Sequence, residues 1–430
     1  MPVVSDYTSI LAYLDADERR WNATEDLGFP VFVSYSFYTA ATLPSVGDLA
    51  YPASGVQAMS SAQQDAVRSA LTQFEAVAGL TFVETTGEAM INAHTVTGSG
   101  YGGWANYPYV TDLTSLVGDY VIDVTNGEKL TGDGMGTLLH EIGHAVGLSH
   151  THGGDVTLEH ALDIRSQTVM SYNWAPTPTD TLGPLDVQAL QNIYGTGANM
   201  NGWTYGFESG VFEVSGAARD DRIMGVEGPN VLKGRNGDDL LVGRDGDDKL
   251  YGGNGDDTLL GMDGADELYG GKGNDLLVSR VQDGVNYTDP GSHKLVGGAG
   301  DDVLLGGDGE DEMLGGGGND RLKGGYGNDT LTGGRGLDVL FGDSGADLFN
   351  FNPVTDRQRD KVRDFVYYAD TLGFGATALV REDFTVQSSG GGAHTVLTID
   401  DGASIDFEIL LMNTVASDIV SYLDYYHDFS

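Results

Sequence analysis

The spacing of apolar residues changes abruptly along this 430-residue chain. In the first half, apolar positions three and four residues apart predict helices over residues 61–78, 133–146 and 184–193. Alternating β-branched and aromatic residues predict strands over residues 30–37, 80–84, 89–93 and 120–124. Ser60 or Ser61 stands where a side-chain oxygen would cap the first helix. The first 200 residues are therefore expected to form an α+β domain.

From residue 225 a nine-residue period of the form G-G-x-G-x-D-x-U-x replaces this pattern. Twelve nonads begin at Gly225, Gly234, Gly243, Gly252, Gly261, Gly270, Gly297, Gly306, Gly315, Gly324, Gly333 and Gly342. Their eighth position is apolar throughout, which a disordered linker rich in Gly and Asp does not explain. We expect six residues of each nonad to form a turn and three to form a strand, so that successive turns stack into an all-β parallel β-roll.

The sixth position of each nonad carries a candidate calcium ligand. It is Asn230 in the first nonad and Asp in the other eleven, and Asp221 precedes them at the same spacing. The eleven are Asp239, Asp248, Asp257, Asp266, Asp275, Asp302, Asp311, Asp320, Asp329, Asp338 and Asp347. Together with carbonyl groups of the turns, these side chains would form oxygen cages of the kind that Ca²⁺ prefers. Because stacked aspartates repel one another, the segment is expected to be largely unfolded without Ca²⁺.

Two segments depart from the period. Residues 279–296 interrupt it but keep Gly291 at position four and Leu295 at position eight, which indicates either decayed coils or a loop that preserves the stacking register. Residues 351–430 lose the period, and alternation over residues 360–366 and 395–399 predicts a small β cap.

Charge and cysteine content narrow the classes of partner. The formal charge of −42 makes nucleic acid an unsuitable partner, whereas divalent cations suit the acidic repeats. The chain has no Cys, which excludes disulfides and a cysteine-based latency switch and suits export. No apolar run approaches the length of a membrane span, and we expect no cleavable N-terminal signal.

One motif in the first half carries the chemistry of a metal site. Residues 140–150 read H-E-x-x-H-x-x-G-x-x-H. His140 and His144 lie one helical turn apart and can reach a single metal, and Gly147 lets the chain turn back to bring His150 as a third ligand. Three imidazoles with an open fourth position are typical of a catalytic zinc ion, and Glu141 could act on a water there. An ordinary helix with a surface histidine pair would explain neither Gly147 nor His150.

The Gly- and aromatic-rich segment 98–108 offers a candidate substrate strand. It could form an exposed sheet edge to which a peptide adds by main-chain hydrogen bonds, or it could be a packed aromatic loop. The candidate substrate-binding residues are Trp104, Ala105, Asn106 and Tyr107.

These motifs together resemble the serralysins, a family of secreted bacterial metzincin proteases with calcium-binding (RTX) nonad repeats. Further matching stretches are Arg20-Trp21-Asn22, Val169-Met170-Ser171-Tyr172 and Gly183-Pro184-Leu185-Asp186. The resemblance implies that His140, His144 and His150 bind one Zn²⁺ and that Glu141 is the general base. It also implies that Met170 forms the apolar floor under the zinc. Tyr172 would be a further ligand that swings away when substrate binds and then serves catalysis by hydrogen-bonding the oxyanion.

The resemblance sets the expected domain order and partners. A pro-segment or first helix (1–20) precedes a zinc metalloprotease domain (21–200), a linker (201–224), the β-roll (225–350, with the insert at 279–296) and a β cap with a secretion signal (351–430). We expect one catalytic Zn²⁺, several structural Ca²⁺, protein or peptide substrates and type I secretion to the extracellular medium. A monomer without membrane insertion is expected, and a proteinaceous inhibitor is a further candidate partner.

The expected activity is therefore that of a secreted zinc-dependent endopeptidase stabilised by Ca²⁺. The alternative is a calcium-dependent surface or adhesion protein whose metzincin domain processes only itself or a single surface partner. The intact Glu141 favours the first, because a vestigial domain would not need its base.

Overall fold

The computed structural model divides the chain into two compact units, Met1–Gly202 and Trp203–Ser430. It describes residues 3–4, 30–43, 55–86, 89–97, 104–105, 109–110, 116–123, 133–148, 157–158, 167–171, 181–196, 200–279, 291–352, 358–374, 384–399 and 407–425. Among these residues no helix combines the length and apolar character that crossing a membrane would need.

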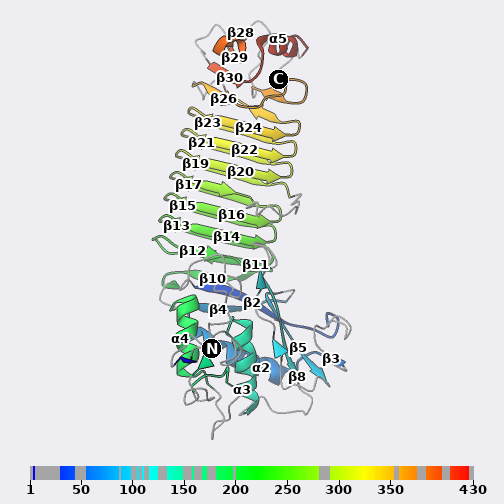
Figure 1. The fold of residues 1–430 in the computed structure, drawn as a ribbon, viewed down its shortest axis with the longest axis vertical. Coiled ribbons are helices and arrows are strands. Elements are labelled where there is room, and N and C mark those ends of the chain that lie inside the picture. The colour runs from blue at the N-terminus through cyan, green and yellow to red at the C-terminus, as the bar shows by residue number, and fades with distance from the viewer. Residues whose placement is uncertain are drawn as a thin grey trace. The chain divides into compact units, whose positions relative to one another are not determined.

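The first unit is built on a mixed seven-stranded sheet (Figure 1). Its main path has the order β4-β2-β5-β8-β6, and β3 and β7 pair with β5 and β8 respectively. The strands are β2 (Val31–Phe37), β3 (Gly55–Gln57), β4 (Leu80–Glu84), β5 (Ile91–Thr97), β6 (Trp104–Ala105), β7 (Tyr109–Val110) and β8 (Leu116–Asp123). A separate parallel pair is formed by β1 (Val3–Val4) and β9 (Thr157–Leu158).

Three helices of this unit confirm the helices that the apolar spacing predicted. They are α2 (Ser61–Glu75), α3 (Asp133–Ala145) and α4 (Pro184–Tyr194). Ser60 caps α2 through a reciprocal pair of hydrogen bonds with Gln63. α3 packs against α2, β8 and β6, and the buried Tyr194 of α4 donates its hydroxyl hydrogen to the carbonyl of Val146, just beyond α3.

The second unit is a parallel β-roll that confirms the nonad prediction. From β11 to β27 its successive strands alternate between two sheets and stack in chain order (Figure 1). The first roll sheet contains β10 (Thr204–Glu208), β11 (Val211–Ser215), β13 (Asn230–Asn236), β15 (Lys249–Asn254), β17 (Glu267–Lys272), β19 (Lys294–Ala299), β21 (Glu312–Gly317), β23 (Thr330–Arg335), β25 (Leu348–Asn350) and β27 (Thr371–Gly373).

The second roll sheet contains β12 (Arg222–Met224), β14 (Leu240–Asp245), β16 (Thr258–Asp263), β18 (Leu276–Val278), β20 (Val303–Asp308), β22 (Arg321–Tyr326), β24 (Val339–Ser344), β26 (Asp360–Val362), β30 (Phe407–Met412), β29 (His394–Ile399) and β28 (Phe384–Ser389). A short 3₁₀ turn, Gly390–Gly392, joins β28 to β29, and α5 (Ala416–Tyr425) follows β30.

The register places identical nonad positions beside one another. Residues 18 apart pair in parallel, so that Leu241 faces Leu259 and Leu250 faces Leu268. Each of these eighth-position side chains is fully buried between the two sheets. One apolar side chain per nonad therefore fills the space between the two sheets, because the next inward position of most strands is a glycine.

The outer faces of the two roll sheets differ in a way that the period does not reveal. The first carries ion pairs between neighbouring strands, such as Lys249 with Glu267 at 2.7 Å. The second carries a further apolar cluster, in which Met224, Val242 and Met262 are buried and Leu240 and Leu260 pack against them. The β-roll thus has a second, smaller apolar layer outside its central core.

Two expected segments differ from their predictions, whereas the insert keeps the stacking register as predicted. Residues 201–224, expected as a linker, instead supply β10, β11 and β12 to the roll, because Asp221 and Ile223 already occupy nonad positions six and eight. In the insert, β19 pairs directly with β17, and Leu268 faces Leu295 across 27 residues, so the second half of the insert is a true nonad with nine extra residues before it. The cap contains α5 in addition to strands.

We predict that the eighth-position residues carry the stability of the roll. Leu322→Ala removes a fully buried side chain and should lower the free energy of unfolding of the calcium-loaded roll by about 2–5 kcal/mol. Leu314→Ala is the matched control because Leu314, at position nine, is 39% exposed, and it should change that free energy by less than about 0.5 kcal/mol. Urea unfolding in Ca²⁺ measures both, and equal losses would contradict the assignment of the core.

Candidate functional sites

The helix α3 buries three titratable side chains in an apolar setting. His140, Glu141 and His144 are 5%, 7% and 5% exposed, and the neighbouring Leu139 and Ile142 are buried as well. The two imidazole rings lie edge to face with their centroids 4.7 Å apart. Burying such groups costs free energy unless they are hydrogen-bonded or bound to a metal, so their clustering marks a candidate functional site.

Hydrogen bonds orient both imidazoles in the manner of metal ligands. Nδ1 of His140 lies 2.7 Å from the carbonyl oxygen of Val169, and Nδ1 of His144 lies 2.7 Å from that of Leu148. Because a carbonyl can only accept, each Nδ1 must carry the proton and each neutral ring keeps its lone pair on Nε2. A carbonyl that fixes the tautomer in this way commonly supports a histidine that binds a metal through its other nitrogen.

The Glu141 carboxyl lies on the same helix beside the two histidines. Burial raises the pKa of Glu141 to about 8, because the ionised form loses its solvation. A dication nearby would favour the carboxylate and lower that pKa. The site is therefore built so that the protonation of Glu141 depends on nearby positive charge.

Met170 packs against α3 at Gly143. It is fully buried, and a Cβ added to Gly143 would meet its Sδ at 2.6 Å. Only glycine at position 143 therefore lets the Met170 thioether approach the helix this closely. Gly147, with a φ of 90°, ends the helical segment as expected from the motif.

Asp186, which sequence reasoning treated only as part of a matching stretch, anchors the segment that holds Met170. Its carboxylate accepts hydrogen bonds from the Thr168 hydroxyl (2.5 Å) and from the backbone N–H groups of Val169 (2.9 Å) and Gly183 (2.8 Å). Burial raises the pKa of Asp186 to about 6, although the three hydrogen bonds oppose that rise. Since Val169 also accepts the His140 bond, Asp186 positions that histidine indirectly.

Several predicted residues of the zinc site lie outside the described residues. These are His150 and Tyr172, together with Asn106 and Tyr107 of the proposed substrate strand. No group of three or more His, Cys, Asp or Glu that could hold a metal occurs among the described residues, a set that contains two of the three predicted histidine ligands. Trp104 and Ala105 form β6, which pairs antiparallel with β8 at one edge of the sheet.

In the β-roll, the sixth-position residues form two buried columns. One contains Asp221, Asp239, Asp257, Asp275, Asp302, Asp320, Asp338 and Asp360, and the other contains Asn230, Asp248, Asp266, His293, Asp311, Asp329, Asp347 and Asp370. In each column a residue donates its backbone N–H to the side chain of the next, as Asp221 does to Asp239 and Asp239 to Asp257, both at 2.8 Å. The predicted calcium ligands therefore all lie together in the structure.

These hydrogen bonds use only one oxygen of each carboxylate. The second oxygen, Oδ2, is buried without a hydrogen-bond partner among the described residues in Asp239, Asp248, Asp257, Asp275, Asp302, Asp320 and Asp329. Burial raises the pKa of Asp239 to about 6, of Asp257 to about 7 and of Asp248 to about 9. Unpartnered carboxylate oxygens at such a density fit the donor set of Ca²⁺.

Three members of these columns were missed by the sequence reasoning. Asp360 and Asp370 follow their column neighbours by 22 and 23 residues, so the broken spacing hid them. His293 stands at position six of the nonad 288–296, and its N–H donates to Asp311 at 2.8 Å. The signal that could have found His293 is Leu295, two residues later at position eight.

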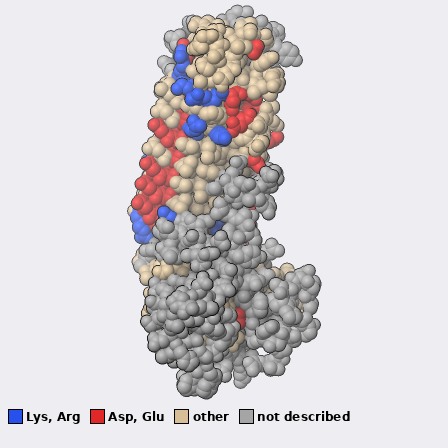
Figure 2. Space-filling model, in the orientation of Figure 1, with Lys and Arg blue, Asp and Glu red and all other residues tan. Residues whose placement is uncertain are grey.

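A second ladder of side chains runs along the exposed turns. At position five, Asp220 and Asp238 each accept the backbone N–H of the residue 18 positions later, at 3.0 and 2.9 Å. Acidic side chains form a stripe along one edge of the roll (Figure 2). This ladder holds successive turns in register from the solvent side. The G-G-x-G-x-D-x-U-x form specifies no residue type at position five, so it does not predict the ladder.

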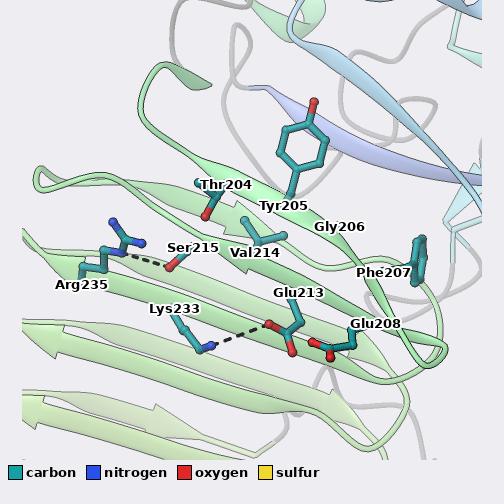
Figure 3. A pocket seen from close by; sticks show the side chains of 10 residues that line it. All are labelled: Thr204, Tyr205, Gly206, Phe207, Glu208, Glu213, Val214, Ser215, Lys233 and Arg235. Carbon is teal, nitrogen blue, oxygen red and sulfur yellow. Dashed lines mark hydrogen bonds and ion pairs between the residues drawn. The ribbon is translucent and has the colours of Figure 1, made fainter.

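A shallow pocket lies on the hairpin β10–β11 and the neighbouring β13 (Figure 3). Within it, Lys233 pairs with Glu213 at 3.9 Å and Arg235 donates to the Ser215 hydroxyl at 3.0 Å. Tyr205 and Phe207 are 52% and 37% exposed. Both cationic side chains of this pocket are paired with its own residues, and we assign the pocket no function.

Comparison with known proteins identifies the repeats. A family model for the RTX calcium-binding nonapeptide repeat (4 copies) matches residues 215–250, 242–277, 287–322 and 314–349. Stacked coils with buried carboxylates therefore define an RTX β-roll, and the repeats support Ca²⁺ as its cofactor.

Two relatives of known class are similar to part of this chain. Serralysin A of Dickeya chrysanthemi is 30% identical over 220 residues, and serralysin C of the same organism is 30% identical over 227 residues. Each alignment covers 45% of this chain and 45% of the relative, so less than half the length of these relatives is matched. The repeats and these relatives support a serralysin-type RTX protein.

Among solved structures, the extracellular lipase LipA from Serratia marcescens is similar at 23% identity. The similarity covers 51% of this chain and 40% of that chain, with a TM-score of 0.24. A TM-score this low does not indicate a shared fold.

We predict that removing the Asp186 carboxylate destabilises the first unit. Asp186→Ala leaves two backbone N–H groups and one hydroxyl buried without their acceptor, which should cost about 3 kcal/mol or more. Asp186→Asn keeps the shape and one acceptor oxygen, and it should cost less. Chemical unfolding followed by near-UV circular dichroism compares them, and an Ala variant as stable as the parent would rule out the anchoring role.

We also predict opposite pH responses for the metal-free and calcium-loaded rolls. The pKa values of Asp239 and Asp257 are raised above 3.8 in the fold, so the metal-free roll binds more protons than the unfolded chain between about pH 4 and about pH 7. Acidification across this window should therefore raise the folded fraction of the metal-free roll, which is low at neutral pH. In Ca²⁺ it should lower the melting temperature, because protons compete with the metal.

Thermal unfolding of the chelator-stripped chain, with and without added Ca²⁺, checks both directions. A metal-free roll that loses stability on acidification would show that folding does not raise the pKa values of these carboxylates.

Proposed function

We propose that this chain is a secreted zinc-dependent endopeptidase whose β-roll is stabilised by Ca²⁺. The observation that carries the proposal is the buried cluster on α3, in which two imidazoles share one tautomer and stand beside a buried carboxyl. A purely structural helix gains nothing from burying three such groups together, whereas a metal-dependent hydrolase needs all of them.

His140, His144 and His150 would hold the zinc, with Tyr172 as a further ligand and Met170 beneath. The donor set fits this ion, because neutral imidazoles that bind through Nε2 are common zinc ligands and the described pair is already oriented for it. When bound, zinc would supply a Lewis acid that lowers the pKa of a water molecule and polarises the scissile carbonyl. Met170, packed on Gly143, would keep the underside of the site dry.

Glu141 would act as the general base. Its carboxylate takes a proton from the attacking water and then passes it to the nitrogen of the leaving amine, so the residue ends the cycle as it began. Its burial favours the first step, because desolvation raises the pKa of the carboxyl and so makes the carboxylate a stronger base. Tyr172 would stabilise the oxyanion by a hydrogen bond.

The substrate would be an extended peptide lying along β6. This strand, Trp104–Ala105, ends the path β4-β2-β5-β8-β6, so its outer side is placed for main-chain pairing with a further strand. Main-chain recognition of this kind favours broad specificity over selection of one partner.

Calcium would link activity to export by type I secretion. Extracellular Ca²⁺ modules commonly bind in the range of about 10⁻⁴–10⁻³ M, so the roll would order outside the cell and stay unfolded inside it. The roll would stay unfolded without the metal because its buried carboxylate oxygens would then lack a positively charged partner.

We predict that Glu141→Gln keeps the zinc and loses the activity. Casein hydrolysis should fall at least about 100-fold because the base is removed. Zinc content should match the parent, since no predicted ligand changes. Glu208→Gln, an exposed change of the same kind in the second unit, is the control and should retain full activity.

Retained hydrolysis in the Glu141→Gln variant would refute the assignment. The same assay addresses the surface or adhesion alternative, because cleavage of many unrelated proteins by the parent favours a general endopeptidase.

A further inference from the structure

The first nonad of the β-roll differs from the others in the chemistry of its sixth position. Asn230 stands at the head of one of the two columns, whereas eleven other nonads carry Asp at their sixth position. Its side chain is 1% exposed. An amide at this place has no negative charge to neutralise, but it brings two N–H hydrogens instead.

The amide nitrogen of Asn230 is surrounded by oxygens. Nδ2 lies 2.8 Å from the carbonyl oxygen of Val226, 2.6 Å from that of Gly228 and 3.2 Å from that of Gly243. It lies 2.8 Å from Oδ1 of Asp248 as well. Four oxygens around one nitrogen exceed its two hydrogens, so these bonds are shared within an oxygen cage.

This cage spans two stacked coils. Val226 and Gly228 belong to the nonad that begins at Gly225, whereas Gly243 and Asp248 belong to the nonad stacked on it. Oδ1 of Asn230 accepts the N–H of Val226 at 2.9 Å, which fixes the direction in which the amide points. Carbonyl and carboxylate oxygens from two coils are the ligands that a Ca²⁺ ion would draw together.

The aspartate coils lack such an internal donor. In Asp239 and Asp257, one oxygen accepts a backbone N–H and the other is buried without a hydrogen-bond partner among the described residues. These coils depend on positive charge from outside the chain, whereas the coil of Asn230 contains its own hydrogens.

The column that begins with Asp221 also has a donor from the protein at its start. Nε of Arg219 lies 3.1 Å from Oδ1 of Asp221, the first member of that column. Both columns therefore start with a nitrogen of the chain itself at the place where the roll begins.

From this geometry we propose that the Asn230 amide replaces a calcium ion, so that the first coil of the roll closes without metal. The proposal rests on calcium binding by the roll and deepens it by assigning one position at which no ion binds. A first coil that is ordered in the absence of Ca²⁺ supplies a template onto which later coils stack as the metal arrives.

The test is the number of Ca²⁺ ions bound by the full chain, measured by equilibrium dialysis of metal-stripped protein against labelled CaCl₂. Asn230→Asp restores a carboxylate in the cage and should bind one more ion than the parent. Asp239→Asn introduces an amide into an aspartate coil and should bind one fewer.

Asn274→Asp is the matched control. Asn274 is exposed at position five, where its side-chain oxygen accepts the N–H of Asp301, and Asp238 and Asp256 occupy the equivalent place in other coils. The change adds the same charge outside the cage and should leave the number of ions unchanged.

An unchanged count in Asn230→Asp, with the parent binding Ca²⁺ normally, would overturn the replacement. If Asn230→Asp does not fold in saturating Ca²⁺, the Asp239→Asn variant provides the test. An unchanged number of bound ions in Asp239→Asn would also overturn the proposal. A parent that binds no Ca²⁺ would instead refute calcium binding by the roll itself.

Discussion

The second unit depends on one electrostatic constraint: two columns of carboxylates are buried between stacked coils with too few donors of their own. One oxygen of each is held by a backbone N–H, and in residues such as Asp257 and Asp320 the other has no hydrogen-bond partner in the described part of the chain. The core supplies one apolar side chain per nonad, and the many glycines make ordering costly in entropy. A bound divalent cation would supply the missing charge and join neighbouring coils, and metal binding would then be coupled to folding.

The first unit applies a related principle on a smaller scale. α3 places two imidazoles and a carboxyl in an apolar interior, and backbone carbonyls decide which nitrogen of each imidazole carries the proton. The support extends outward through Val169 to Asp186, a buried carboxylate whose hydrogen bonds are all accounted for within the protein. Many carboxylates of the roll have one oxygen without a hydrogen-bond donor, whereas both oxygens of Asp186 accept hydrogen bonds. This difference separates a metal-binding role from an anchoring one.

Much of this architecture could be predicted from the sequence because it is periodic. The nine-residue repeat specifies both the inward residue, such as Leu241, and the column residue, such as Asp239, and the helical spacing of α2, α3 and α4 was sufficient to locate them. What escaped prediction depends on contacts between residues distant along the chain. Asp186 bonds to a segment 17 residues away, and Asp360 joins its column only after irregular spacing. The apolar outer cluster around Met224 and Met262 also arises from stacking and has no counterpart in the repeat form.

We propose that the two metals have separate roles, with zinc serving the chemistry and Ca²⁺ serving the fold. The most direct measurement is casein hydrolysis by the full chain in buffer that holds Ca²⁺ at saturation while a zinc-selective chelator removes zinc. We expect hydrolysis to stop while the far-UV circular dichroism of the chain is unchanged, and we expect stoichiometric zinc to restore the activity. Hydrolysis that continues after zinc has been removed would contradict it.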